Sequence, residues 1–308
     1  MGLLEYTKCP FCESGKYKQL FSGKDFLFSK EEFSVVKCQD CGLRYTNPRV
    51  KQDQIKSYYY TGYSSYESPD LGLNKKNKNV LYRFFGNIHF EVLEFIKSVN
   101  ARTVLEIGPG NGSLLYFLKD QGFDVCGVEL DSSSAQKIME HGVKCYSGDL
   151  NSVISEMSGK KFDIVILCQA FEHLYNPKMT LTNIHKILND NGALYLSLPN
   201  SGSMEARLFG KFWRGFDLPR HIVHYDKKTI KSMLNKSGFS VIAQYNQNFP
   251  SSFVESLGFC LFRKRKISTK LYYFLYYLWK LISPIHLRLI GSGVMTVISV
   301  NQKGCERK

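Results

Sequence analysis

The sequence predicts an α/β protein, with a parallel sheet covered by helices on both faces and a small metal-held module near its N-terminal end. Short apolar stretches alternate with helix-forming stretches from residue 103 to residue 198, which is typical of a parallel sheet. One apolar stretch runs into glycines at positions 108, 110 and 112 and then into Leu114–Leu118, as a strand, a turn and a helix would. Two Cys-x-x-Cys pairs within the first 41 residues predict the metal-held module.

The bulk composition is that of a globular protein with a basic surface. Of the 308 residues, 44% are apolar and 22% are charged, and 41 basic against 27 acidic residues give a net charge of +14. A nucleic acid, a membrane surface or a phosphorylated sugar or nucleotide would each suit that sign. Met1–Leu20 lacks the apolar stretch of a signal peptide, and no apolar run reaches the ~20 residues that span a bilayer. We therefore expect a cytoplasmic protein whose nine cysteines are reduced or bind metal.

Residues 1–48 are predicted to form a zinc-ribbon-like module. Its four candidate metal ligands are Cys9, Cys12, Cys38 and Cys41. Each pair can form a tight turn that points two thiolates at one ion, and strands at Tyr17–Phe21 and Phe33–Lys37 would connect the two turns. Because all four positions would be filled, we expect a structural Zn²⁺ that stabilises a segment too short to build a secure core.

Residues 49–79 form a tyrosine-rich segment between the module and the rest of the chain. Its tyrosines lie at positions 58, 59, 60, 63 and 66. They either pack between domains or line a substrate pocket in which their rings and hydroxyl groups contact a sugar, and the sequence leaves both uses open. Residues 67–79 are polar and rich in Asn and Lys, which predicts a linker or a mobile loop.

The central part of the chain alternates between predicted helices and predicted strands. Helices are expected at 84–99, 132–141 and 179–188, and strands at 103–105, 125–130, 143–146, 162–168 and 193–198. Asn191-Gly192 predicts a turn before the last of these strands. Glu129 ends one strand, 23 residues after Glu106, where its carboxylate can accept hydrogen bonds from both hydroxyls of a ribose. Asp149 follows the next strand, beside the expected position of an adenine.

These motifs resemble those of class I methyltransferases that use S-adenosylmethionine. The resemblance covers roughly residues 80–250 and rests on Val-Leu-Glu-Ile-Gly-Pro-Gly-Asn-Gly at 104–112, Gly-Val-Glu-Leu-Asp at 127–131, Gly-Asp-Leu at 148–150, Phe-Asp-Ile-Val at 162–165, Phe-Glu-His-Leu-Tyr-Asn-Pro at 171–177 and Leu-Ser-Leu-Pro-Asn at 196–200. A dehydrogenase would instead have Gly-x-Gly-x-x-Gly, and here the third glycine comes one residue early. The resemblance implies a Rossmann-like, seven-stranded methyltransferase sheet across residues 80–308.

The same resemblance assigns a cofactor site for S-adenosylmethionine. Gly108, Gly110 and Gly112 would hold the amino acid portion, with Glu106 nearby. Glu129 would hold the ribose, Asp149 and Leu150 the adenine, and residues at the end of the 162–168 strand, among them Cys168 and Gln169, would border the sulfonium. Methyl transfer is an in-line displacement, so we expect the protein to contribute mainly positioning and desolvation.

An oxygen acceptor also needs a base, and four residues are candidates for acid–base chemistry. Glu172 and His173 follow a predicted strand at the edge where ligands bind, and a structural use of His173 in ordering its loop stays open. In quinone-precursor O-methyltransferases a further Glu three residues earlier completes a metal site. That position is Gln169 here, so we do not expect that metal.

His221 and His224 belong to a second block, Trp-Arg-Gly-Phe-Asp-Leu-Pro-Arg-His-Ile-Val-His-Tyr at 213–225. This block resembles one in bacterial methyltransferases associated with polysaccharide and sugar biosynthesis. Together with the N-terminal module and the tyrosines it also resembles deoxysugar methyltransferases, although these have a further C-terminal domain that this chain lacks. Burying His, Arg and Asp together is unfavourable unless they are paired or contact a ligand. We take His221 as the first choice for the base, with His173 and His224 behind it.

The C-terminal third is predicted to complete the sheet around an unusual insertion. We expect a helical insertion at 201–211, a helix at 229–236, a strand at 238–242, and a last strand at 293–300 that runs antiparallel beside it. Residues 255–290 form a basic and aromatic helical insertion, with Arg-Lys-Arg-Lys at 263–266 and an aromatic run at 271–282. We expect residues 263–285 to contact the inner face of the membrane, and the alternative is a lid or dimer helix.

Together these features predict a methyltransferase that acts on a nucleotide- or lipid-linked saccharide in cell-surface polysaccharide biosynthesis. The first alternative is an O-methyltransferase of a quinone precursor or another lipid-soluble phenol, for which a zinc module is less expected. The second, of a different class, is a zinc-ribbon protein that binds nucleic acid. We do not expect the second, because the basic residues are not concentrated between Cys9 and Cys41, where several acids also lie.

Overall fold

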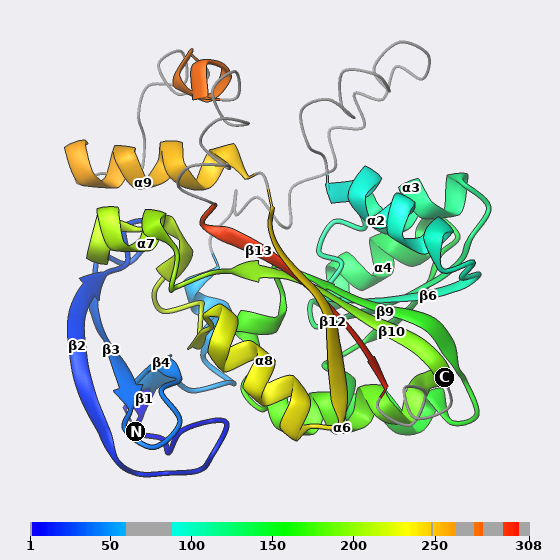
Figure 1. The fold of residues 1–308 in the computed structure, drawn as a ribbon, viewed down its shortest axis with the longest axis horizontal. Helices are drawn as coiled ribbons and strands as arrows, with labels where there is room; N and C mark the ends of the chain where they lie inside the picture. The colour runs from blue at the N-terminus through cyan, green and yellow to red at the C-terminus, as the bar shows by residue number, and fades with distance from the viewer. Residues whose placement is uncertain (1, 60–87, 248, 263–273, 280–291, 302–308) are drawn as a thin grey trace.

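A seven-stranded mixed sheet forms the centre of the protein (Figure 1). The computed structural model describes residues 2–59, 88–247, 249–262, 274–279 and 292–301. Strands follow the order β12-β13-β10-β9-β6-β7-β8 across the sheet. Their bounds are β6 Thr103–Ile107, β7 Asp124–Glu129, β8 Lys144–Ser147, β9 Phe162–Cys168, β10 Leu188–Pro199, β12 Phe239–Gln247 and β13 Val294–Asn301.

The pairing within this sheet is parallel except around β13. Strands β8, β7, β6, β9 and β10 pair in parallel, as the alternating pattern of the sequence predicts. The last strand, β13, lies between β10 and β12 and runs antiparallel to both, with Val297 opposite Leu196 on one side and Gln244 on the other. The predicted antiparallel position of the last strand beside the sixth is therefore confirmed.

Helices cover both faces of the sheet because alternate side chains of each strand point to opposite sides. Val104 of β6 packs into one core with α2 (Ile88–Ser98), α3 (Ser113–Asp120) and α4 (Ser132–Glu140). The next residue, Leu105, packs into the other core with α5 (Leu150–Val153), α6 (Pro177–Ile187) and α8 (Lys227–Lys236). Figure 1 shows α6 and α8 on one side of the sheet and α2–α4 on the other. The α/β fold class is confirmed.

The N-terminal strands form a sheet with a strand from later in the chain and pack against the rest of the protein. A four-stranded sheet has the order β11-β4-β3-β2, and its edge strand β11 (Val223–His224) comes from the second histidine block. The other strands are β2 Tyr17–Lys24, β3 Glu32–Cys38 and β4 Arg44–Thr46, while β1 (Leu4–Glu5) pairs with β5 (Arg49–Val50). Val36 joins the core shared with α6 and α8, and its neighbour Val35 packs in a third core with Trp213 and α7 (Met204–Phe209).

Two predicted local elements, a turn at Asn191-Gly192 and a helical insertion at 201–211, can be compared with the structure. The predicted turn at Asn191-Gly192 is wrong, because β10 continues from Leu188 through these residues. A register shift between Leu188 and Ala193 accommodates them within the strand. The predicted helical insertion at 201–211 is present as α7 followed by the 3-10 turn Gly210–Phe212.

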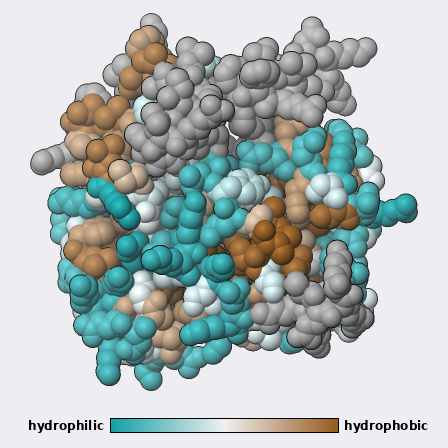
Figure 2. Space-filling model, in the orientation of Figure 1, coloured by the Kyte–Doolittle hydropathy of each residue, from teal (hydrophilic) through white to brown (hydrophobic). Residues whose placement is uncertain are grey.

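The C-terminal insertion is described only in part. Helix α9 spans Pro250–Phe262, and residues 274–279 are also helical. Figure 2 shows apolar side chains over these two segments at the upper left, and Leu261, Phe274 and Tyr277 are all exposed. The basic cluster at 263–266 and most of the predicted membrane-contact segment lie outside the described residues, as do the tyrosines at 60, 63 and 66 and the predicted linker at 67–79. None of the helices in the described ranges combines the length and apolarity that a membrane span requires.

Candidate active site

The glycine loop connects β6 to α3 at the carboxyl edge of the sheet. Gly108, Gly110 and Gly112 have φ angles of 74°, 56° and 76°, in the left-handed region that favours glycine. A Cβ atom on Gly108 would lie 2.9 Å from the Cβ atom of Ala170, so this position has no room for a side chain. The Gly108 amide also donates to the Val128 carbonyl oxygen (2.8 Å), which ties the loop to β7.

A cavity of about 330 Å³ lies against this loop. The structure brings eight of the predicted cofactor residues to its wall: Glu106, Gly108, Gly110, Glu129, Asp149, Leu150, Cys168 and Gln169. Gly112 is not among the lining residues and instead occupies the N-cap of α3, where a Cβ atom would lie 2.8 Å from the ring of Tyr116. Its requirement for glycine therefore comes from the turn itself.

Two of the three acids of this cavity, Glu106 and Glu129, are buried, and Glu106 is only partly hydrogen-bonded. Glu106 is 4% exposed, and its Oε2 atom has no hydrogen-bond partner in the described structure. Burial, together with the nearby Glu129 carboxylate, raises the pKa of Glu106 to about 8. Glu129 accepts from the Gly110 and Asp131 amides (2.9 Å each), and Asp149 caps α5 by accepting from the Asn151 amide (2.7 Å). An orphaned buried carboxyl at the wall of an open cavity fits a ligand that carries a donor, such as the ammonium group of S-adenosylmethionine.

A second cavity, of about 190 Å³, adjoins the first and shares Gln169 and His173 with it. Seven of its twelve lining residues are polar. The lining residues are Gln169, His173, Pro199, Arg214, Gly215, His221, Phe249, Ser251, Ser252, Glu255, Gly293 and Val294. Arg214 Nε donates to Glu255 Oε2 at 2.6 Å, so a half-buried ion pair lies in this wall.

Both histidines of the second cavity have their tautomer set by the backbone. His221 Nδ1 lies 2.8 Å from the Gly215 carbonyl oxygen, and His173 Nδ1 lies 3.0 Å from the Arg220 carbonyl oxygen. A carbonyl oxygen only accepts, so each Nδ1 carries the proton and each Nε2 keeps its lone pair. Burial lowers the pKa of His173 to about 4, and burial and the neighbouring His173 lower the pKa of His221 well below its usual value. Both imidazoles are therefore neutral at pH 7, and both can accept a proton at Nε2.

Glu172 lies beside these two rings. It is 1% exposed, and both of its carboxyl oxygens lack a hydrogen-bond partner in the described structure. Its Oε1 atom is 3.8 Å from His221 Nε2, and one polar atom each of Glu172, His173 and His221 falls within 4.8 Å of the others. Burial raises the pKa of Glu172 to about 8, so near neutral pH the carboxyl is mostly protonated. The structure thus places a protonated carboxyl and two basic nitrogens together.

The structure does not bring His224 to this cluster. His224 lies in β11, opposite Arg44 of β4, and its Nε2 atom is 3.1 Å from Thr46 Oγ1. It lines neither cavity, so its place as a candidate base is not supported. The pairing of β11 with an N-terminal strand is a long-range contact, which the spacing of the histidines does not reveal.

Two further residues at the site were not among the predicted site residues. Arg214 lines the second cavity, and its position within the aromatic stretch before His221 was the only signal in the sequence. Tyr59 lines the first cavity, and its hydroxyl oxygen is 3.1 Å from His173 Nδ1. The tyrosine-rich segment indicated this region without distinguishing Tyr59 from its neighbours.

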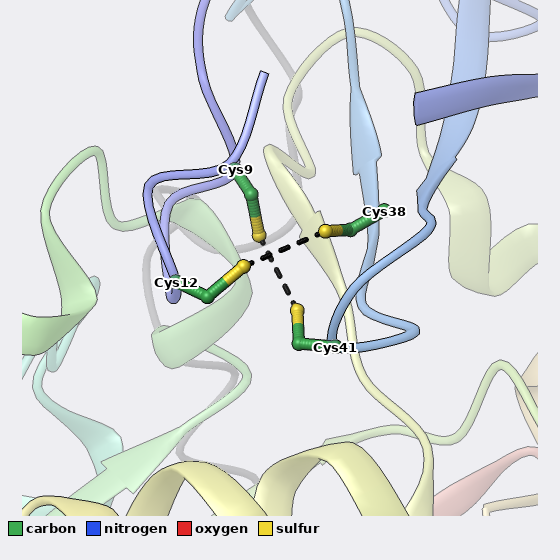
Figure 3. Close-up of side chains that lie close together, drawn as sticks. All are labelled: Cys9, Cys12, Cys38 and Cys41. Carbon is green, nitrogen blue, oxygen red and sulfur yellow. Dashed lines mark hydrogen bonds between the residues drawn. The ribbon is translucent and has the colours of Figure 1, made fainter. Parts of the chain in front are cut away.

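The four cysteines of the N-terminal module converge on one point (Figure 3). The Sγ atoms of Cys9 and Cys41 are 3.5 Å apart, as are those of Cys12 and Cys38. A tetrahedral Zn²⁺ with Zn–S bonds of about 2.3 Å needs sulfur atoms about 3.8 Å apart, so the set fits the ion. Against the raising effect of burial, backbone N–H groups of Cys41 and Asp40 lower the pKa of the Cys38 thiol to about 7.

Comparison with known proteins shows which family this sequence matches. The family described as a methyltransferase domain matches residues 76–244, more than half of the 308-residue chain. The ubiquinone biosynthesis O-methyltransferase of Rickettsia conorii (strain ATCC VR-613 / Malish 7) is 31% identical over 102 residues, which is 32% of this chain and 35% of that protein. The protein of the same name from Rickettsia canadensis (strain McKiel) is 27% identical over 115 residues, 36% of this chain and 48% of that protein.

These two matches span between 35% and 48% of the relatives' own lengths. A solved structure of a SAM-dependent methyltransferase from Archaeoglobus fulgidus is similar at a TM-score of 0.47 and 16% identity, covering 73% of this chain and 99% of that one.

Replacing Gly108 with alanine should weaken the binding of S-adenosylmethionine about tenfold or more, because the new Cβ atom would collide with Ala170 at the cavity wall. Gly122→Ala is the matched control, because Gly122 also has a positive φ angle (88°) but open space around it. Both variants should lose about 1 kcal/mol of stability to backbone strain. Isothermal titration calorimetry that shows equal affinities for the two variants would contradict this use of the loop.

Replacing Glu172 with glutamine should stabilise the protein at alkaline pH. The pKa of Glu172 is about 8 in the folded state, against an ordinary value of 4.5. As pH rises between these values, the unfolded chain releases a proton that the folded chain retains, so wild-type stability falls with pH. Glutamine does not titrate, so the advantage of Glu172→Gln should be small at pH 5 and on the order of 3 kcal/mol at pH 8.

Urea unfolding at the two pH values measures this difference. The exposed Glu94→Gln on α2 is the control and should show no such change with pH. An advantage for Glu172→Gln that does not grow between pH 5 and pH 8 would show that the wild-type carboxyl is ionised in the folded protein.

Proposed function

Because the chain belongs to the methyltransferase-domain family, we propose that it transfers a methyl group from S-adenosylmethionine to a nucleotide- or lipid-linked saccharide in cell-surface polysaccharide biosynthesis. The observation that supports a saccharide acceptor is the second cavity, which is small, has seven polar residues among its twelve lining residues, and shares Gln169 and His173 with the cofactor cavity. Its volume of about 190 Å³ is below the roughly 300 Å³ at which pockets for drug-sized ligands begin, and so suits a single ring.

The cofactor would occupy the cavity beside the glycine loop. S-adenosylmethionine supplies an electrophilic methyl group on a sulfonium. The backbone at Gly108 and Gly110 would approach its amino acid portion, with the orphaned Glu106 carboxyl as a partner for the ammonium group. Glu129 would accept from the ribose hydroxyls, and Asp149 and Leu150 would border the adenine. Gln169, which lines both cavities, would lie where the methyl group passes from one ligand to the other.

The lining of the second cavity supports a polyhydroxylated acceptor. Ser252 and Glu255, one turn apart on α9, and Arg214, which is paired with Glu255, offer donors and acceptors on one side of the wall, as a sugar with several hydroxyl groups requires. A site that hydrogen-bonds each hydroxyl discriminates strongly against a ligand that lacks one, because the protein group is then left unpaired. Phe249, Pro199 and Val294 provide the few apolar contacts, which suit the face of a ring.

His221 would act as the base for a hydroxyl acceptor, with His173 as the second choice. Each has a neutral imidazole whose Nε2 lone pair is available at pH 7, because each Nδ1 donates to a backbone carbonyl. Glu172 lines neither cavity, and its carboxyl, protonated near neutral pH and 3.8 Å from His221 Nε2, would help to orient the His221 ring. General-base catalysis of this kind contributes about 10²–10⁴-fold.

A second candidate function is O-methylation of a quinone precursor or another lipid-soluble phenol. Its support is the name of the two Rickettsia relatives, which match about a third of this chain. The ion pair and serines in the wall of the second cavity favour the saccharide over an acceptor with a long apolar tail.

The test of the proposed function is mass spectrometry of surface glycans from cells with and without the gene. Loss of the gene should remove one methyl group from a sugar residue of the glycan. Complementation with the wild-type chain should restore it, and complementation with His221→Ala should restore about a hundredth of it or less.

Lys161→Ala is the matched control, because Lys161 is exposed and lines neither cavity, and it should complement fully. Glycans that are identical with and without the gene, together with a methyl group missing from the quinone pool, would overturn the saccharide in favour of the second candidate.

We also propose that the four cysteines hold a structural Zn²⁺ that stabilises the N-terminal sheet. Purified protein should contain about one zinc ion per chain by elemental analysis, and Cys12→Ser should lose it together with several kcal/mol of stability. Cys260→Ser is the control, because Cys260 is exposed on α9 and belongs to no cysteine cluster in the described structure. Wild-type protein that is free of zinc and fully folded after dialysis against a chelator would contradict the proposal.

A further inference from the structure

Arg220 is the largest fully buried side chain among the described residues, at 1% exposed, and it directly precedes His221. Its guanidinium contacts two buried acids from distant parts of the chain. Asp25, at 0% exposed, belongs to the N-terminal segment, while Asp217 belongs to the same loop as Arg220. Burying a cation and two anions is costly unless each is well paired, so the geometry of the group decides what it does.

The guanidinium joins the N-terminal segment to the histidine loop through a set of short hydrogen bonds. Arg220 Nη2 and Nη1 donate to the two carboxylate oxygens of Asp25 at 2.8 and 3.2 Å. Nη2 and Nε donate to Asp217 Oδ1 at 2.7 and 3.1 Å, and Nη1 donates to the Tyr58 carbonyl oxygen at 3.0 Å. A planar fork held on two sides in this way has little freedom to move.

Asp25 is itself a fixed anchor. Its carboxylate accepts hydrogen bonds from the backbone amides of Leu27, Phe28 and Ser29, at 2.9–3.0 Å. These bonds set the orientation of the carboxylate before Arg220 is considered. Asp25 therefore positions Arg220, because its own turn already holds it in place.

The backbone around Arg220 orients both candidate bases. The Arg220 carbonyl oxygen is the partner of His173 Nδ1 at 3.0 Å, and the Asp217 carbonyl oxygen accepts from the His221 amide at 3.1 Å. Asp217 Oδ2 also lies 3.8 Å from His221 Nε2. Tyr58, which accepts from Arg220, directly precedes Tyr59, whose hydroxyl oxygen is 3.1 Å from His173 Nδ1. A shift of the guanidinium would therefore move groups that contact both rings.

We propose that Asp25 is a positioning residue of the active site, which acts through Arg220 to fix the loop that carries His221 and the carbonyl group that orients His173. The N-terminal segment is then part of the catalytic apparatus, although Asp25 touches neither cavity. The proposal rests on the proposed function in that the two histidines serve methyl transfer. An ion pair that only joined the N-terminal segment to the rest of the protein would need no contact with the histidine loop. Well-packed apolar side chains join two surfaces at least as well as a buried ion pair.

The test uses the full-length chain with Asp25→Asn, which keeps the shape of the side chain and an oxygen for the backbone amides but removes its charge. In spectra of ¹⁵N-histidine-labelled protein, the side-chain signals of His173 and His221 should move, and the Nδ1 proton of His173 should exchange faster with water. In the glycan assay, methylation should fall about 100-fold, the effect expected of a misplaced catalytic group. The affinity for S-adenosylmethionine should change less than about twofold, because Asp25 lies outside the cofactor cavity.

The matched control is Arg44→Gln, which breaks another contact between the N-terminal sheet and the rest of the chain. Arg44 donates to the carbonyl and hydroxyl oxygens of Ser201 and lies 3.7 Å from Asp226, and none of these contacts involves the Arg220 guanidinium, His173 or His221. This variant should lose stability but keep the His173 and His221 signals and the methylation of the wild type. If Asp25→Asn fails to fold, Arg220→Lys is the second test, because lysine keeps the positive charge but lacks the planar group that contacts both aspartates. It should move the His173 and His221 signals and lower methylation in the same way.

A folded Asp25→Asn protein with wild-type histidine signals and wild-type methylation would overturn the proposal, and so would Arg220→Lys with both unchanged. The two readouts separate this proposal from the proposed function. If the chain does not methylate a glycan, the assay is blank for the wild type too, and the histidine signals alone then decide whether Asp25 positions the rings.

Discussion

Parallel pairing of β6 with β7 on one side and β9 on the other is the constraint on which the site depends. Glu106 pairs with Gly127 of β7 and Ile166 of β9, so the three strands end together. Their carboxyl ends therefore bring Glu106, Glu129 and Gln169 to one edge of the sheet, against one cavity. The glycine loop can close over this edge because position 108 carries no side chain to meet Ala170.

Buried acids without partners distinguish the site from the surrounding core. Most buried polar groups in a folded protein are hydrogen-bonded, yet Glu106 and Glu172 both keep carboxyl oxygens without one in the described structure. Burial raises the pKa of each to about 8, and the same burial costs folding stability. Glu106 lines the first cavity, so a ligand can supply its missing partner, while Glu172 lies 3.8 Å from His221, which lines the second cavity. The folding stability lost through unpaired buried carboxyls is therefore confined to the region of the proposed cofactor and acceptor sites.

The N-terminal segment and the active site form one packed region. Strand β11, next to His221, pairs with β4, and Val36 of β3 shares a core with helices of the main sheet. The Arg220 carbonyl oxygen and the Tyr59 hydroxyl oxygen both lie within hydrogen-bond distance of His173 Nδ1. The four cysteines hold the ends of this small sheet, so a metal bound there would stabilise the surface on which the histidine loop rests.

The sequence by itself determined the features that follow from spacing along the chain. The strand, glycine turn and helix at 103–118, the acids at successive strand ends and the paired cysteines are all local patterns, and the structure places each as expected. Only the tertiary structure separates His221 from His224, which lie three residues apart in one motif. His224 pairs with Arg44 in a strand some 180 residues away, while His221 lies in a cavity beside Glu172. The contact between Arg220 and Asp25 is of the same kind. Such contacts depend on how distant segments pack, and no local periodicity records that.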